Sequence, residues 1–123
     1  MATDLENIQR LLDRFKRPIP SGDDYQTRLV EEFELILSQR FTDYFLQICD
    51  IIDLTTDLTH MTRGSAGSSL VCYLLGITDV DPIKWNIPVA RFMNPMRDDL
   101  PDVDIDFEHH RQTEVMERIF RKW

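Results

Sequence analysis

Aspartate and apolar residues alternate strictly near the end of the chain, in the segment Pro101-Asp102-Val103-Asp104-Ile105-Asp106-Phe107. Successive side chains of a β-strand point to opposite faces, so the pattern predicts a strand over 102–107 with one apolar and one acidic face. Three neighbouring carboxylates repel one another unless a cation lies on them, and a hard divalent ion is the simplest such cation. The segment therefore predicts a metal site on a sheet, with Asp102, Asp104 and Asp106 as ligands.

The same pattern has two other interpretations. A solvated edge strand would also leave its aspartates in water, although aspartate is depleted in strands. The Asp-x-Asp-x-Asp start is shared with EF-hand calcium loops. Those loops need glycine at the sixth position and glutamate at the twelfth, where this chain has Phe107 and Thr113. The calcium loop is therefore excluded, whereas the edge strand stays open as an alternative.

The charge of the chain is concentrated in the same region. The formal net charge is -8 over 123 residues, and most of the excess comes from the acids within 98–108, namely Asp98, Asp99, Asp102, Asp104, Asp106 and Glu108. No basic patch of the kind that nucleic-acid-binding proteins carry is evident. A nucleic-acid partner would thus require metal ions or another segment to neutralise its phosphates.

Length and composition favour a small globular unit. A chain of 123 residues suffices for one small domain or a piece of a larger one. No apolar run is long enough to cross a bilayer and no signal segment stands at the start, so we expect no membrane association and a cytoplasmic location. Cys49 and Cys72 both lie among apolar residues, which predicts buried thiols rather than a metal site.

A second motif combines small residues with a helix start. The segment Arg63-Gly64-Ser65-Ala66-Gly67-Ser68-Ser69 precedes the apolar run 70–75, which Gly76 closes. Glycines at a helix start let a phosphate approach the backbone amides, with Arg63, Ser65 and Ser69 as further donors. An N-capped helix packed tightly against a neighbour explains the residues equally well. The Gly-Lys-Ser/Thr ending of a Walker P-loop is absent.

The rest of the sequence predicts mainly helices. Apolar residues recur at helical spacing before Pro18, from about Tyr25 onwards, over 44–54 and after Glu108. Residues 55–62 and 79–87 are typical of loops and turns. We expect residues 1–20 to form an N-terminal helical segment and residues 21–123 to form the unit that contains the turn 63–69 and the strand 102–107.

Four segments, taken together, resemble one known family. They are 63–71, Leu75-Gly76-Ile77-Thr78-Asp79-Val80-Asp81-Pro82, Arg91-Phe92-Met93-Asn94-Pro95 and 101–107. Their order and content resemble the palm domain of the C-family bacterial DNA polymerases, the alpha subunits of polymerase III. The ending Asp106-Phe107-Glu108-His109-His110-Arg111 is most similar to the error-prone branch. The resemblance covers about residues 25 to 123.

The resemblance implies a fold, an activity and a set of site residues. The expected fold is α/β, a partial polymerase-beta-like nucleotidyltransferase palm that is rich in helices and has a small sheet. The implied activity is DNA-directed DNA polymerase chemistry, a two-metal nucleotidyl transfer to a primer 3′ end in DNA replication or translesion synthesis. Asp104 and Asp106 match the catalytic metal pair and Asp102 matches the acid before it. The nucleotide-binding positions are Arg63, Gly64, Ser65, Ser69 and Arg91.

The implied cofactor is Mg²⁺, and the implied substrates are primer-template DNA and deoxynucleoside triphosphates. The family uses a third carboxylate and further domains that we do not find in this sequence, so we expect the isolated chain to polymerise little. The alternative is a non-catalytic remnant or an interaction module that assembles with a complementary polymerase fragment, a clamp or a loader. A generic magnesium-nucleotide binder is a further option.

Overall fold

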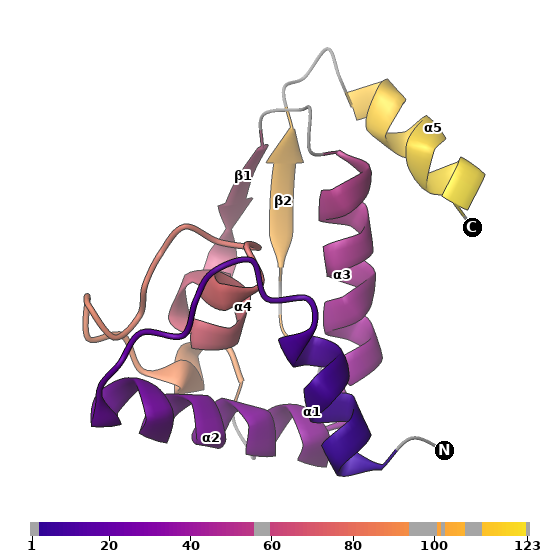
Figure 1. Ribbon diagram of the computed structural model, residues 1–123. Helices are drawn as coiled ribbons and strands as arrows, with labels where there is room; N and C mark the ends of the chain where they lie inside the picture. Colours follow the sequence, from indigo (N-terminus) through magenta and orange to yellow (C-terminus); the bar gives the residue numbers. More distant parts are fainter. Residues whose placement is uncertain (1–2, 56–59, 94–100, 102, 108–111, 123) are drawn as a thin grey trace.

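A computed structural model describes residues 3–55, 60–93, 101, 103–107 and 112–122. For residues 60–64, 104, 106 and 107 only the backbone is described. Helices dominate this part of the chain (Figure 1). The α-helices are α1 (Asp4–Leu12), α2 (Asp23–Ser38), α3 (Thr42–Leu54), α4 (Leu70–Leu74) and α5 (Gln112–Lys122).

The short elements lie around α4. The 3₁₀ helix η1 (Gly64–Ser68) leads into α4, and a second one, η2 (Val89–Arg91), follows the turns after it. The strands β1 (His60–Arg63) and β2 (Asp104–Phe107) form a single two-stranded antiparallel ladder. In Figure 1, β2 lies between β1 and α3, and α5 packs beyond the end of α3.

The predicted α/β class and the polymerase-beta-like palm are wrong. An α/β domain is built on a sheet layer whose faces are covered by helices. In the described residues the strands are only four residues each and pair with nothing further, while the helices pack mainly on one another. Alternation along 102–107 identifies a strand, but it does not specify how many partners that strand finds. The described fold is therefore helical with one small ladder.

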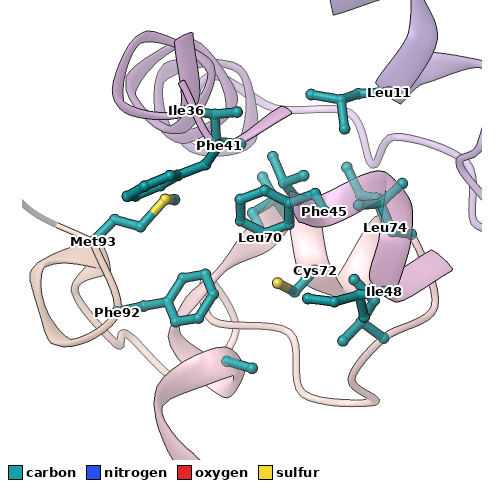
Figure 2. Close-up of a cluster of buried hydrophobic side chains, with 14 of the residues drawn as sticks. Leu11, Ile36, Phe41, Phe45, Ile48, Leu70, Cys72, Leu74, Phe92 and Met93 are labelled. Carbon is teal, nitrogen blue, oxygen red and sulfur yellow. The ribbon is translucent and has the colours of Figure 1, made fainter. Parts of the chain in front are cut away.

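The core is formed where α2, α3 and α4 meet. Phe45 of α3 is fully buried and its ring meets Phe92 edge to face, with centroids 6.0 Å apart. Figure 2 shows Leu70 and Phe92 around Phe45, with Cys72 nearby. Leu11 of α1 is also fully buried in this cluster. Burial of such side chains stabilises the fold by roughly 1.5–3 kcal/mol each, before cavity and entropy costs.

The helical periodicity predicted most of these elements. Three predicted helices are confirmed as α1, α2 and α3. They are the helices predicted before Pro18, from about Tyr25 and over 44–54. Strand β2 lies within the predicted strand, whereas Asp102 lies outside the described residues. One prediction was wrong, because 60–62, expected in a loop, belong to β1. A strand of polar composition has no periodic signal, and only its partner β2 makes it a strand.

The predicted buried thiols are confirmed, because Cys49 and Cys72 are both free and buried.

No helix in the described ranges combines the length and apolarity that crossing a bilayer requires.

Candidate nucleotide and metal site

The β ladder brings the two predicted motifs together. Its register pairs Arg63 with Asp104 and Met61 with Asp106. Gly64 follows Arg63 directly and begins η1, so the backbone of the acidic strand lies beside the start of the glycine-serine turn. These two segments are distant in sequence, and hydrogen bonding between strands is what makes them neighbours.

The side chains predicted to bind metal are not among those that the structure describes. Asp102 and the side chains of Asp104 and Asp106 are outside the described residues, so their metal-binding role stays a prediction. Among the side chains that are described, no group of three or more His, Cys, Asp or Glu residues could hold a metal ion.

The turn after β1 is compact and partly buried. Ser65 and Gly67 are half-buried, while Ala66 and Ser68 are buried. A Cβ added at Gly67 would lie 3.6 Å from Cβ of Val80, which is ordinary van der Waals contact. The protein therefore has room for a methyl group at Gly67, and tight packing within the chain does not require glycine there.

Ser69 is the N-cap of α4. Its backbone is extended, and its Oγ accepts a hydrogen bond from the amide of Cys72 at 3.1 Å. Its hydroxyl also donates to Oε1 of Glu32 at 2.6 Å, and the residue is fully buried. Ser69 thus has the capped-helix role that the sequence offered as the alternative to phosphate binding. Its role as a nucleotide ligand stays a prediction, and direct contact would require these bonds to rearrange.

A buried carboxylate occupies the first turn of α4. Glu32 of α2 is fully buried, and its oxygens accept from the amides of Leu70 at 2.7 Å and Val71 at 3.0 Å. Helix N-termini present unpaired N–H groups and attract negative charge. At α4 this demand is met by a side chain of the protein itself, so these amides are not open to a phosphate in this arrangement.

Burial raises the pKa of the Glu32 carboxyl above its ordinary value. Loss of hydration disfavours the ionised form more than the hydrogen bonds from Ser69, Val71 and Leu70 and the charge of Arg28 favour it. Burial also raises the pKa of the neighbouring Cys72 thiol, which keeps that thiol protonated. The protonated thiol is not a candidate nucleophile, and both oxygens of Glu32 are engaged by hydrogen bonds within the protein.

Arg28 connects this network to the segment that carries Arg91. Its Nε donates to Oε2 of Glu32 at 3.0 Å. Its terminal nitrogen donates to the carbonyl oxygens of Ser68 and Ile87, both at 2.6 Å. Ser68 ends η1, and Ile87 lies shortly before η2, whose last residue is the exposed Arg91. The turn and the Arg91 segment are therefore held to the same guanidinium group.

Sequence reasoning missed Arg28 and Glu32. A signal for Glu32 was present, because it falls between Leu29 and Phe33 on the apolar stripe of α2, whose members are buried. A charged residue on an apolar stripe is rarely buried without a partner. The identity of that partner could not be read from spacing, since the bonded groups of α4 are backbone amides distant in sequence.

The chain is similar to bacterial DNA polymerase subunits over most of its length. The family model described as the bacterial DNA polymerase III alpha NTPase domain matches residues 5–123. The DNA polymerase III subunit alpha of Staphylococcus aureus (strain MRSA252) is 41% identical over 116 residues, which cover 92% of this chain and 11% of that protein. An error-prone DNA polymerase of Bdellovibrio bacteriovorus is 38% identical over 112 residues, covering 89% of this chain and 10% of its own length.

The chain therefore belongs to the bacterial DNA polymerase III alpha NTPase domain family, which confirms the resemblance seen in the sequence. The chain spans about a tenth of the length of the curated relatives it matches.

Proposed function

We propose that the chain is a metal- and nucleotide-binding segment of a DNA-directed DNA polymerase that acts in DNA synthesis. One observation carries the proposal, namely the register that pairs Arg63 with Asp104 and so sets the acidic strand beside the turn 64–68. Membership of the polymerase III alpha family adds independent support. The substrates would be deoxynucleoside triphosphates and primer-template DNA.

In this proposal Asp104 and Asp106, with Asp102, hold Mg²⁺. Carboxylate oxygens are the ligands that this ion prefers, and positions two apart on one strand belong to the same face of it. When bound, Mg²⁺ ions would neutralise charge on the phosphates during nucleotidyl transfer. Arg63 and Arg91 contribute positive charge toward the triphosphate, while Gly64 and Ser65 form the turn beside it. Ser69 acts in part by capping α4 behind that turn.

Thermal unfolding tests this proposal. We expect Mg²⁺ with dATP to raise the melting temperature of the chain, because a ligand that binds only the folded state stabilises it. Asp104→Asn should abolish that rise. Glu34→Gln, which removes one charge from an exposed position on α2, should keep it. An equal rise in the Asp104→Asn variant would contradict the assignment of the metal site.

A primer-extension assay tests whether this chain can catalyse DNA synthesis by itself. Because the chain spans about a tenth of its relatives' length, we expect the 123 residues alone to extend a primer little. Strong extension that Asp104→Ala eliminates would show that this segment suffices for catalysis.

A non-catalytic interaction module is the second candidate, and one apolar cavity favours it. A cavity of about 490 Å³ lies between α3, β2 and α5, lined by Tyr44, Ile48, Ile51, Val103, Ile105, Gln112, Val115, Met116 and Ile119. Met116 and Phe120 of α5 are 53% and 75% exposed. Exposed apolar surface of this kind is typical of contacts with other polypeptides. Stabilisation by a complementary polymerase segment, with none by Mg²⁺ and dATP, would favour this candidate.

A further inference from the structure

Two charged residues on one face of α2 are buried far beyond what is usual for their type. The side chains of Arg28 and Glu32 are 11% and 0% exposed and form an (i, i+4) ion pair. Buried charges are costly unless hydrogen bonds and opposite charges offset the loss of water. An apolar pair of similar size would fill the same space at less cost, so the contacts that these two make need an explanation beyond packing.

Each of the two residues contacts a different part of the predicted nucleotide site. Glu32 fixes the first turn of α4 through Ser69, Leu70 and Val71. Arg28 fixes the end of η1 through the Ser68 carbonyl and the chain before η2 through the Ile87 carbonyl. Both carbonyls bond to the same terminal nitrogen of Arg28, so the turn cannot shift relative to the Arg91 segment without breaking one of these bonds.

A neighbouring contact anchors the same connection. The hydroxyl of Tyr25, also on α2, donates to Oδ2 of Asp81 at 2.6 Å, and Asp81 Oδ1 accepts from the amides of Ile83 and Lys84. Helix α2 thus holds the chain between α4 and η2 at two places, Asp81 and Ile87. Helix α2 therefore supports both segments. Its residue Arg28 contacts the turn 64–68 through Ser68 and the Arg91 segment through Ile87.

We propose that Arg28, held by Glu32, is a positioning residue that sets the turn 64–68 and the Arg91 segment at a fixed separation for the triphosphate. This inference rests on the proposed function. In this inference Arg28 does not touch the nucleotide. It acts through the backbone carbonyls of Ser68 and Ile87. A guanidinium group is planar and directs its donors in fixed directions, whereas a lysine ammonium is a flexible point charge. The proposal therefore requires arginine at this position and not merely a positive charge.

The test compares Arg28→Lys with Arg14→Lys in the full chain. Arg14 is the matched control, because it also joins distant segments, through Asp50 and Asp53 on α3, but lies outside the proposed site. The measurement is the Kd for dATP in the presence of Mg²⁺, at a temperature where every variant is folded. Arg28→Lys should weaken binding roughly tenfold, as expected for loss of charged hydrogen bonds that fix the site. Arg14→Lys should bind as the wild type does.

The outcomes separate this inference from the proposed function. Wild-type binding that Arg28→Lys leaves unchanged would overturn the positioning role and leave the proposed function standing. A wild-type chain that binds no dATP would overturn the proposed function and the inference with it. Equal weakening of dATP binding in Arg28→Lys and Arg14→Lys would show that the effect is not specific to Arg28 and would also overturn the positioning role.

Amide hydrogen exchange provides a second measurement, which does not depend on nucleotide. In Arg28→Lys, exchange should accelerate together at the amides of 69–72 and 91–93, because one anchor serves both. Acceleration in only one of these segments would contradict the joint anchoring. If Arg28→Lys does not fold, Glu32→Gln replaces it, since it removes the charge that holds Arg28. Glu32→Gln also replaces one of the two oxygens that accept from the α4 amides, so the readout for this variant is the exchange at 91–93. Faster exchange there and the same roughly tenfold weakening of dATP binding are expected, and unchanged exchange at 91–93 would contradict the role of Arg28.

Discussion

Single residues decide where α4 ends. Gly76 has φ +80°, and the amides of Gly76 and Ile77 donate to the carbonyls of Tyr73 and Cys72. This is the Schellman arrangement, in which the residue after the C-cap takes the left-handed conformation that glycine tolerates best. The glycine stop predicted from the sequence is thus confirmed, and Gly76 is needed for its backbone conformation.

Substitution at Gly76 tests this requirement. Gly76→Ala should destabilise the protein by ~1–2 kcal/mol, the usual cost of a left-handed residue with a Cβ. The new Cβ would also lie 2.8 Å from Cδ of Lys16, which would have to move. Urea unfolding measures the change.

The control is Gly67→Ala, where φ is ordinary and the space suffices. It should leave the free energy of unfolding nearly unchanged. If Gly67→Ala leaves stability unchanged but weakens dATP binding, glycine is required at this position by the ligand and not by the fold. Equal destabilisation by both substitutions would contradict the argument.

Elements are joined here by ion pairs between the segment that follows α1 and helix α3. Arg14 contacts Asp50 at 3.0 Å and Asp53 at 2.8 Å, and Lys16 contacts Asp53 at 2.9 Å. Burial alone would raise the pKa of Asp53, but the hydrogen bonds and charges of Lys16 and Arg14 outweigh it and hold the pKa below its ordinary value. The ionised form is therefore favoured by the folded state.

This lowered pKa predicts a pH dependence. A carboxyl whose pKa is depressed on folding stabilises the protein above its unfolded pKa, and the contribution is lost as pH falls through the folded pKa. Asp53→Asn should therefore destabilise the protein near neutral pH. The loss should be only about 0.5–1 kcal/mol, because the side chain is 47% exposed and water screens the pairs.

Urea unfolding of the wild type and Asp53→Asn across the acid range provides the measurement. The difference in unfolding free energy should shrink as pH falls below the ordinary range of carboxyl groups. A difference that stays constant into strong acid would show that the ion pairs do not cause it.

The whole molecule controls the reactivity of its two thiols. Cys49 and Cys72 are 2% and 0% exposed. Burial raises the pKa of Cys49 to about 11, and it raises that of Cys72 further still. The thiolate is the reactive form of cysteine. Both thiols are therefore protected from reagents, because they are buried and because they stay protonated.

We expect iodoacetamide to label neither cysteine in native buffer, and to label both as urea unfolds the chain. Mass spectrometry at increasing urea measures the extent of labelling, with fully unfolded protein as the reference. Because both thiols belong to the same core cluster, their labelling curves should coincide. Early labelling of Cys49 alone would indicate that α3 opens separately from α4.

Much of the local structure was predictable from periodicity. The apolar stripes of α2 and α3, the small-residue turn before α4 and the alternation in β2 each carry a signal that depends on near neighbours in the chain. The fold class was not predictable in the same way. Strand β2 could have joined a larger sheet, and its pairing with β1 alone in the described residues depends on which surfaces the helices leave open.

The sequence by itself determined the family, the positions of the helices and the acidic and glycine-serine motifs, because these depend on residue type and spacing along the chain. Only the tertiary structure decided that Arg63 lies opposite Asp104 and that Glu32 caps α4. The same holds for Arg28, which ties the turn to the Arg91 segment. The physical reason is that these contacts join groups distant in the chain, several of them backbone groups that every residue carries, so no local pattern specifies their partners.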